Sequence, residues 1–160
     1  MRVYISGPLQ SAIDLKAARE LYEYAGDICE LCGITPYLPH QNTDPIHHAD
    51  ASDLAVFDRD CSALREADLI LAFVGRPSSG VGAEIAMACG MSKRIIAASH
   101  VNESPSRFLR GLLACYPQAV VLTYHDKNHL RSLLQRELSF LIRDTEDTDR
   151  SVGCSSASDR

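Results

Sequence analysis

Residues 68–74, DLILAFV, form an apolar run that begins with one acid and then contains no polar residue. A strand of this kind is buried on both faces, which is typical of a parallel sheet covered by helices on each side. Similar short runs occur at 2–6, 34–38, 94–98 and 119–123. The five runs therefore predict the strands of one parallel sheet.

Segments with helical spacing of apolar residues alternate with these runs. They span 12–32, 51–67, 80–91, 104–116 and 126–143, and Gly33 is placed to cap the first of them. The alternation predicts one α/β domain over residues 1–143, with a doubly wound, five-stranded parallel sheet of flavodoxin-like or Rossmann-like type. The polar remainder, 144–160, lacks periodicity, and we expect a disordered tail there.

Composition narrows the possible partners. A chain of 160 residues with a net charge of −5 is long enough for one core, and its charge argues against binding nucleic acid or an anionic membrane. No apolar run approaches the roughly 18 residues of a membrane span, and the N-terminus reads as a strand rather than a signal peptide. The cysteines mostly lie within apolar periods and are expected to be reduced thiols. We expect a cytoplasmic protein.

Ligands of open parallel sheets bind beyond the carboxyl ends of the strands, so the loops at 7–11, 39–50, 75–83 and 99–106 are expected to carry the site. In the third of these loops, RPSSGVGAE leads into a helix expected to begin near Gly80. The amino end of a helix favours an anion or sugar hydroxyls, and glycines allow a ligand to approach the backbone closely. The stretch is neither a Walker loop nor a GxGxxG motif.

Three side chains near these loops could carry chemistry. Glu84 is expected in the first turn of its helix, as an ionised carboxylate able to act as a nucleophile; alternatively, it only complements the helix dipole. Asp60 borders the buried face of its helix, where an acid must be paired or used. Tyr4 lies just before the end of the first strand, so its hydroxyl could reach the site; the alternative is a core role. Asp68, at the opposite end of a strand, is expected to be structural.

Four segments together resemble the nucleoside 2-deoxyribosyltransferases and their close relatives, the 2'-deoxynucleoside 5'-phosphate N-hydrolases. The segments are VYISGP at 3–8, DCSALREADLILAFV at 60–74, PSSGVGAEIAMACGMSKRII at 77–96 and SPSRFLRG at 104–111. The resemblance implies that Glu84 attacks the anomeric C1' of a deoxyribosyl group, expels the base and leaves a glycosyl ester. It also implies that Asp60 assists the leaving base or positions the sugar, and that Tyr4 orients the nucleophile. Backbone contacts would come from Gly7, Gly80 and Gly82.

The two branches of this family differ at the 5' end of the sugar. Transferases commonly carry an Asp six residues before the nucleophile, where this chain has Ser78, and borrow a C-terminal Asn that this chain lacks. Ser78 and Ser106 resemble the hydrolase arrangement, in which serines bind a 5'-phosphate and the second comes from a partner subunit. This implies a homodimer or larger assembly. The first loop departs from the hydrolase pattern, with Pro8 and Gln10 in place of a hydroxyl and an Arg.

The resemblance implies cleavage of the N-glycosidic bond of a 2'-deoxyribonucleoside or its 5'-monophosphate, with no metal or redox cofactor. Water is favoured slightly over a second base as the acceptor, so transfer remains an alternative. A nucleotide sensor without turnover is an alternative of another class. The loop that includes Leu9 is expected to contact the substrate, and His40 is expected near the base. The cations that could supply charge to a phosphate are Arg76, Arg107 and Arg110.

Overall fold

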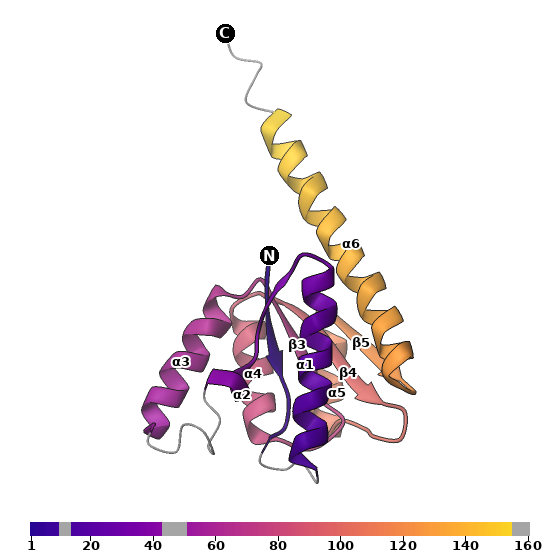
Figure 1. Ribbon diagram of the computed structural model, residues 1–160. Helices are drawn as coiled ribbons and strands as arrows, with labels where there is room; N and C mark the ends of the chain where they lie inside the picture. The colour runs from indigo at the N-terminus through magenta and orange to yellow at the C-terminus, as the bar shows by residue number, and fades with distance from the viewer. Residues whose placement is uncertain (10–13, 43–50, 155–160) are drawn as a thin grey trace.

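The computed structural model of the chain describes residues 1–9, 14–42 and 51–154 (Figure 1). One parallel sheet is formed by β1 (Arg2–Ser6), β2 (Thr35–Tyr37), β3 (Leu69–Phe73), β4 (Arg94–His100) and β5 (Ala119–Tyr124). The strand order is β2-β1-β3-β4-β5, that of a flavodoxin-like doubly wound sheet. The expected fold class is confirmed.

Helices cover both faces of the sheet (Figure 1). One face packs against α1 (Leu15–Leu31) and α6 (Lys127–Cys154), and the other against α3 (Asp53–Glu66), α4 (Ser79–Gly90) and α5 (Arg107–Cys115). Successive residues of β3 alternate between the two cores, and all of them are buried. This explains why the sequence of β3 is apolar without interruption.

The element bounds differ from the expected ones mainly at helix starts. The helix expected from residue 12 begins at Leu15, and it ends before Gly33, whose φ of 76° suits the expected glycine cap. The loop expected over 39–50 begins with a short helix, α2 (Pro39–Asn42), and its remaining residues lie outside the described part of the chain. α5 begins at Arg107 rather than 104, because the Ser106 hydroxyl caps it.

The C-terminal helix α6 is longer than expected. Leucines at i, i+4, i+8 and i+11 anchor it to the sheet: Leu130, Leu134, Leu138 and Leu141. Instead of ending near 143 in a disordered tail, the helix continues to Cys154 and extends away from the body (Figure 1). Polar contacts support the first turn beyond the apolar stripe, since Arg94 pairs with Asp144 and the Thr145 hydroxyl donates to the Leu141 carbonyl. The periodicity of apolar residues could not report such contacts.

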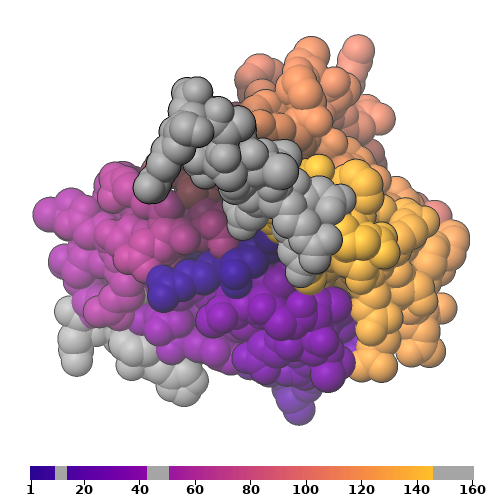
Figure 2. Space-filling model, turned by 90° about the horizontal axis from the view of Figure 1, so that it is seen from above, coloured from indigo at the N-terminus to yellow at the C-terminus, as the bar shows by residue number. Residues whose placement is uncertain are grey.

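The amino ends of the strands form the edge remote from the expected site. In the view from above, the N-terminal segment lies between α3 and α1 (Figure 2). Asp68 lies here, as expected, and its carboxylate accepts a hydrogen bond of 2.6 Å from the Arg2 backbone N–H. Cys29, Cys32, Cys61, Cys89 and Cys115 are free thiols. None of the helices in the described ranges has the length and apolar character needed to cross a membrane.

Candidate active site

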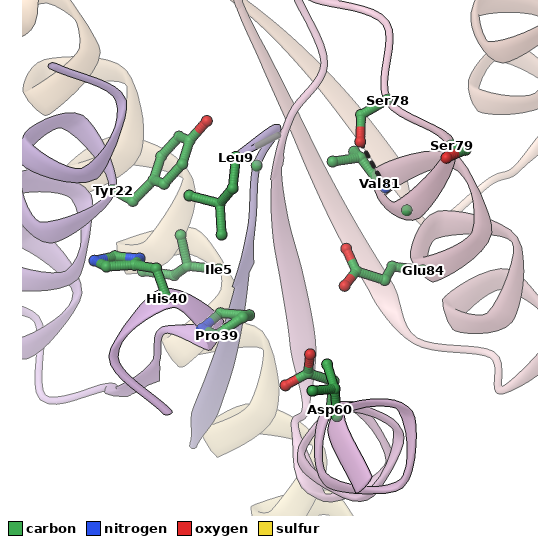
Figure 3. A pocket seen from close by; sticks show the side chains of 13 residues that line it. Ile5, Leu9, Tyr22, Pro39, His40, Asp60, Ser78, Ser79, Val81 and Glu84 are labelled. Carbon is green, nitrogen blue, oxygen red and sulfur yellow. Dashed lines mark hydrogen bonds between the residues drawn. The ribbon is translucent and has the colours of Figure 1, made fainter. Parts of the chain in front are cut away.

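A cavity of about 290 Å³ opens beyond the carboxyl ends of β1 and β3. These strands flank the switch point of the sheet, where ligands of such folds bind. Its walls come from β1 and the loop after it, α1, α2, α3 and the start of α4 (Figure 3): Ile5, Gly7, Leu9, Tyr22, Pro39, His40, Val56, Asp60, Ser78, Ser79, Gly80, Val81 and Glu84. The cavity thus gathers most of the residues expected at the site.

Glu84 enters the cavity from α4. We expected Glu84 in the first turn of its helix. Because α4 begins at Ser79 with Ser78 as its N-cap, Glu84 lies in the second turn instead. Both carboxylate oxygens are hydrogen-bonded from β1: the Tyr4 hydroxyl donates to Oε1 at 2.7 Å, and the Ser6 hydroxyl donates to Oε2 at 2.5 Å. Two donors from one strand therefore fix the plane of this carboxylate.

Burial dominates the electrostatics of Glu84. Burial raises the pKa of Glu84, the hydroxyls of Ser6 and Tyr4 lower it, and the nearby charge of Asp60 raises it. Burial also raises the pKa of Tyr4 well above its usual range, so this phenol stays protonated and remains a donor. We expected the helix terminus to hold Glu84 ionised, but that effect is confined to the first turn. The two hydroxyls are the groups that favour its charge.

Asp60 faces the same cavity from α3 (Figure 3). Its Oδ1 accepts a hydrogen bond of 3.0 Å from the Tyr37 hydroxyl at the end of β2. The ring of Tyr37 stacks on the ring of Tyr4, with centroids 5.5 Å apart and planes 20° apart. Two carboxylates therefore meet in one cavity, and each is bonded to one member of a stacked pair of tyrosines.

The loop after β1 is held by Tyr22 of α1. The Tyr22 hydroxyl donates to the Pro8 carbonyl at 3.0 Å, and a Cβ on Gly7 would lie 2.2 Å from Cζ of the same ring. Gly7 is thus required by a packed side chain, a reason the sequence did not reveal. Pro8 lines a neighbouring cavity, and Gln10 lies outside the described residues.

His40 lies at the far end of the cavity from Ser78 (Figure 3). It is buried, at 6% exposure, and its Nε2 is 3.2 Å from Oε1 of Glu23. His40 thus lines the same cavity as Asp60, and its approach to a base stays a prediction.

Two further expected residues lie outside the cavity of Glu84. Gly82 and Ser106 line a separate, mostly apolar groove of about 350 Å³ between α4 and α5. Of the residues that line it, only Ser78, Ser79 and Val81 also line the cavity of Glu84. The Ser106 hydroxyl caps α5, accepting from the Leu109 N–H at 3.2 Å, and Ser78 caps α4 in the same way. The structure of one chain therefore does not bring Ser106 to Glu84.

The three arginines that could supply positive charge to a phosphate do not line the cavity of Glu84. The Nε of Arg76 is 2.8 Å from Oε1 of Glu103, so its charge is already compensated. Arg107 and Arg110 are exposed on α5. Within the described ranges, no group of three or more His, Cys, Asp or Glu side chains is placed to hold a metal ion.

Sequence reasoning missed Ser6 and Tyr37. Ser6 could have been found from period two, since residues 4 and 6 of one strand point to the same face. Tyr37 required the pairing of strands, because Tyr37 is the register partner of Tyr4 only in the folded sheet.

Comparison with known proteins places the chain in a family. The family model described as nucleoside 2-deoxyribosyltransferase matches residues 3–134. Among solved structures, the CMP N-glycosidase of Clostridium botulinum superposes with a TM-score of 0.67 at 23% identity, over 86% of this chain and 99% of that one. The 2-deoxyribosyltransferase of Bacillus psychrosaccharolyticus gives 0.60 at 16% identity, over 82% and 90%. These two likenesses concern the fold.

Similar sequences carry related names. A protein of Syntrophotalea carbinolica, provisionally named 2'-deoxynucleoside 5'-phosphate N-hydrolase 1, is 36% identical over 88 residues, which cover 54% of this chain and 60% of that relative. The 5-hydroxymethyl-dUMP N-hydrolase of Tetraodon nigroviridis is 29% identical over 101 residues, covering 60% and 68%. Because the family model spans most of the chain and the cavity holds the expected carboxylates, the chain belongs to the nucleoside 2-deoxyribosyltransferase family.

Proposed function

We propose that the protein hydrolyses the N-glycosidic bond of 2'-deoxyribonucleoside 5'-monophosphates or 2'-deoxyribonucleosides through a deoxyribosyl ester on Glu84. The observation that carries the proposal is the carboxylate of Glu84, oriented by Tyr4 and Ser6 in a cavity that also contains Asp60. A nucleotide sensor would have no need of a buried carboxylate held by two donors. The names of the relatives support hydrolysis at this bond.

The first step is displacement at C1'. An oxygen of Glu84 forms a bond to C1' while the C1'–N bond breaks. The electron pair of the C1'–N bond leaves with the base, which takes up a proton from solvent. Asp60 lies in the same cavity wall and either assists the departing base or holds the sugar. Tyr4 is fully buried behind Glu84, so it acts by positioning the nucleophile.

The second step releases the sugar. Water attacks C1' and loses a proton to solvent, a new C1'–O bond forms while the bond from C1' to the Glu84 oxygen breaks, and the carboxylate is restored. The proton lost by water balances the one that the base took up. Two displacements at one carbon retain its configuration. Because Glu84 is buried, its carboxylate is weakly solvated and its pKa is raised. The hydroxyls of Tyr4 and Ser6 favour the ionised form that must attack.

The cavity suggests an orientation for the substrate. Ser78, Ser79 and Gly80 lie at one end, at the amino terminus of α4, where backbone N–H groups and the helix dipole favour a 5'-phosphate (Figure 3). His40 and Asp60 lie toward the other end, where we place the base. The sugar then lies beside Glu84.

We also propose a homodimer in which Ser106 reaches the partner's site. The groove that contains Ser106 is mostly apolar, and the neighbouring Phe108 is 84% exposed, which is unusual for a large apolar side chain. The groove and the cavity of Glu84 share Ser78 and Ser79, so a second chain in the groove would lie next to the 5' end of the substrate. Free thiols suit the reducing cytoplasm, where we place the enzyme.

Transfer of the deoxyribosyl group to a second base is the competing function. The match to the family model described as nucleoside 2-deoxyribosyltransferase favours it. The test is to incubate deoxyribonucleosides and their 5'-monophosphates with and without a free base, and to quantify free sugar, free base and exchanged nucleoside. We expect free deoxyribose 5-phosphate or deoxyribose to dominate. Exchanged nucleoside as the main product would overturn hydrolysis in favour of transfer.

Glu84→Gln tests the covalent step, because the amide is a poor nucleophile of the same size. We expect base release to fall by at least about a thousandfold, together with loss of the sugar adduct seen by intact-protein mass spectrometry. Glu66→Gln is the matched control, since Glu66 pairs with Arg2 at the remote edge of the sheet. An unchanged rate in Glu84→Gln would eliminate the mechanism.

A further inference from the structure

We propose that Tyr37 is a positioning residue that fixes the orientation of Asp60 and favours its ionised form. The observation is a hydrogen bond of 3.0 Å from the Tyr37 hydroxyl to Oδ1 of Asp60, made across the end of the sheet from β2 to α3. For catalysis, the inference rests on the N-glycosidase function proposed above. For the titration of Asp60 in the free protein, it stands by itself.

The register of the sheet places Tyr37 for this role. Tyr37 is paired with Tyr4 on the adjacent parallel strand, so the two side chains share the face that α3 and α4 cover. The rings stack, and each phenol donates to a different carboxylate: Tyr4 to Glu84 at 2.7 Å and Tyr37 to Asp60 at 3.0 Å. The stacked pair therefore links the positions of the two acids.

The hydrogen bond from Tyr37 reaches α3 where the exposure of the helix changes. Leu54 and Phe57 are 67% and 55% exposed, whereas Cys61 and Leu64 further along are buried. Asp60 lies at the boundary between these halves. A second hydrogen bond joins α3 to the end of α2, since the Arg59 guanidinium donates to the Asn42 carbonyl at 2.6 Å.

Tyr37 is a donor at every relevant pH. Burial and the charge of Asp60 raise the pKa of Tyr37 well above its usual range. A phenol that cannot ionise favours the charged form of the carboxylate that accepts its hydrogen bond. Other titratable groups interact electrostatically with Asp60 from the elements packed around it: Tyr4 on β1, Glu84 on α4 and Cys61 on α3. Arg59 on α3 acts on Tyr37, and His40 on α2 lines the same cavity.

The test compares Tyr37→Phe with wild type by ¹³C NMR titration of the Asp60 carboxyl in the free protein. Phe keeps the stacked ring and removes only the donor, so the fold should survive, and circular dichroism checks this. We expect the Asp60 midpoint to move to higher pH by about 1 pH unit, the effect of one lost hydrogen bond to a charged group. Tyr4→Phe should instead move Glu84 most, and Tyr116→Phe, whose hydroxyl donates to the remote Lys93 carbonyl, should move neither.

Activity supplies the second measurement. Asp60→Asn identifies the limb of the pH–rate profile that depends on Asp60, and Tyr37→Phe should move that limb in step with the NMR midpoint. An unchanged midpoint, or a loss of rate without any movement of the midpoint and limb, overturns the proposal and leaves Tyr37 a packing residue. If wild-type protein releases no base from any substrate tested, the proposed function fails, and the midpoint alone decides the role of Tyr37.

Discussion

Ser6→Ala removes a hydroxyl that contacts the proposed nucleophile from inside the sheet. Ser6 is 1% exposed, and its Oγ lies 2.5 Å from Oε2 of Glu84. A hydrogen bond to a charged group contributes about 1.5–3 kcal/mol, and one between neutral groups about 0.5–1.5 kcal/mol. We therefore expect the variant to lose about 1.5–3 kcal/mol of unfolding free energy where Glu84 is ionised, but only about 0.5–1.5 kcal/mol where it is protonated.

The pH dependence has a definite sign. Because burial raises the pKa of Glu84, the folded chain binds this proton more tightly than the unfolded chain, and the free energy of unfolding falls as pH rises through the titration. Loss of the Ser6 donor strengthens that fall. The difference between the two costs, about 1–1.5 kcal/mol, corresponds to about 1 pH unit. Since the ionised form attacks, the acid limb of kcat/KM should move to higher pH by that amount.

Urea unfolding at acidic and weakly alkaline pH, together with the pH profile of kcat/KM, measures both effects. Ser99→Ala is the matched control, because Ser99 is likewise buried, at 5% exposure, but lies on β4, two strands away from β1, and no described hydrogen bond joins it to Glu84. Its destabilisation should be the same at both pH values. Equal losses in Ser6→Ala at both pH values, with an unmoved acid limb, would refute the reasoning.

Two further predictions concern the loop after β1 and the groove at α5. Gly7→Ala places a Cβ 2.2 Å from Cζ of Tyr22, and it should lower the free energy of unfolding by about 1–3 kcal/mol, measured by thermal unfolding. Gly90→Ala is the control, because its Cβ meets nothing within 4 Å, and it should not lower that free energy. Equal effects of the two substitutions would contradict the packing argument. Phe108→Asp should convert a dimer into monomers in light scattering without loss of folding, since Phe108 is 84% exposed, whereas Phe140→Asp on α6 should not. An unchanged mass for Phe108→Asp would place any interface elsewhere.

The fold was predictable because its pattern is local. Each strand is a short apolar run, and each helix repeats apolar residues at its own period, so the order of elements follows from the sequence. The end of α6 was not predictable in this way. The ion pair between Arg94 of β4 and Asp144 of α6 joins residues 50 positions apart, and the periodicity of apolar residues does not report such a contact.

The site was predictable in part, for a related reason. Asp60 and Glu84 stand out because each is an acid at a position where a helix faces the carboxyl ends of the strands. Of the groups that donate to them, Tyr4 was expected from its place near the end of the first strand, and Ser6 shares its face by period two, whereas Tyr37 depends on the pairing of β1 with β2. The requirement for Gly7 depends likewise on Tyr22, which approaches from another element.

Control of the two acids follows from the alternation and register of β1 and β2. Tyr4 and Ser6 share one face of β1 by period two, and Tyr37 joins them because it is paired with Tyr4. A shift of β1 by one residue would turn both hydroxyls of that strand toward α1. Glu84 would then lie in its buried place without donors, an arrangement that costs about 1–3 kcal/mol or more for a charged group. The register of β1 and the ionisation of the nucleophile are therefore coupled, so variants that loosen the edge strand β2 should alter the pH profile before they unfold the chain.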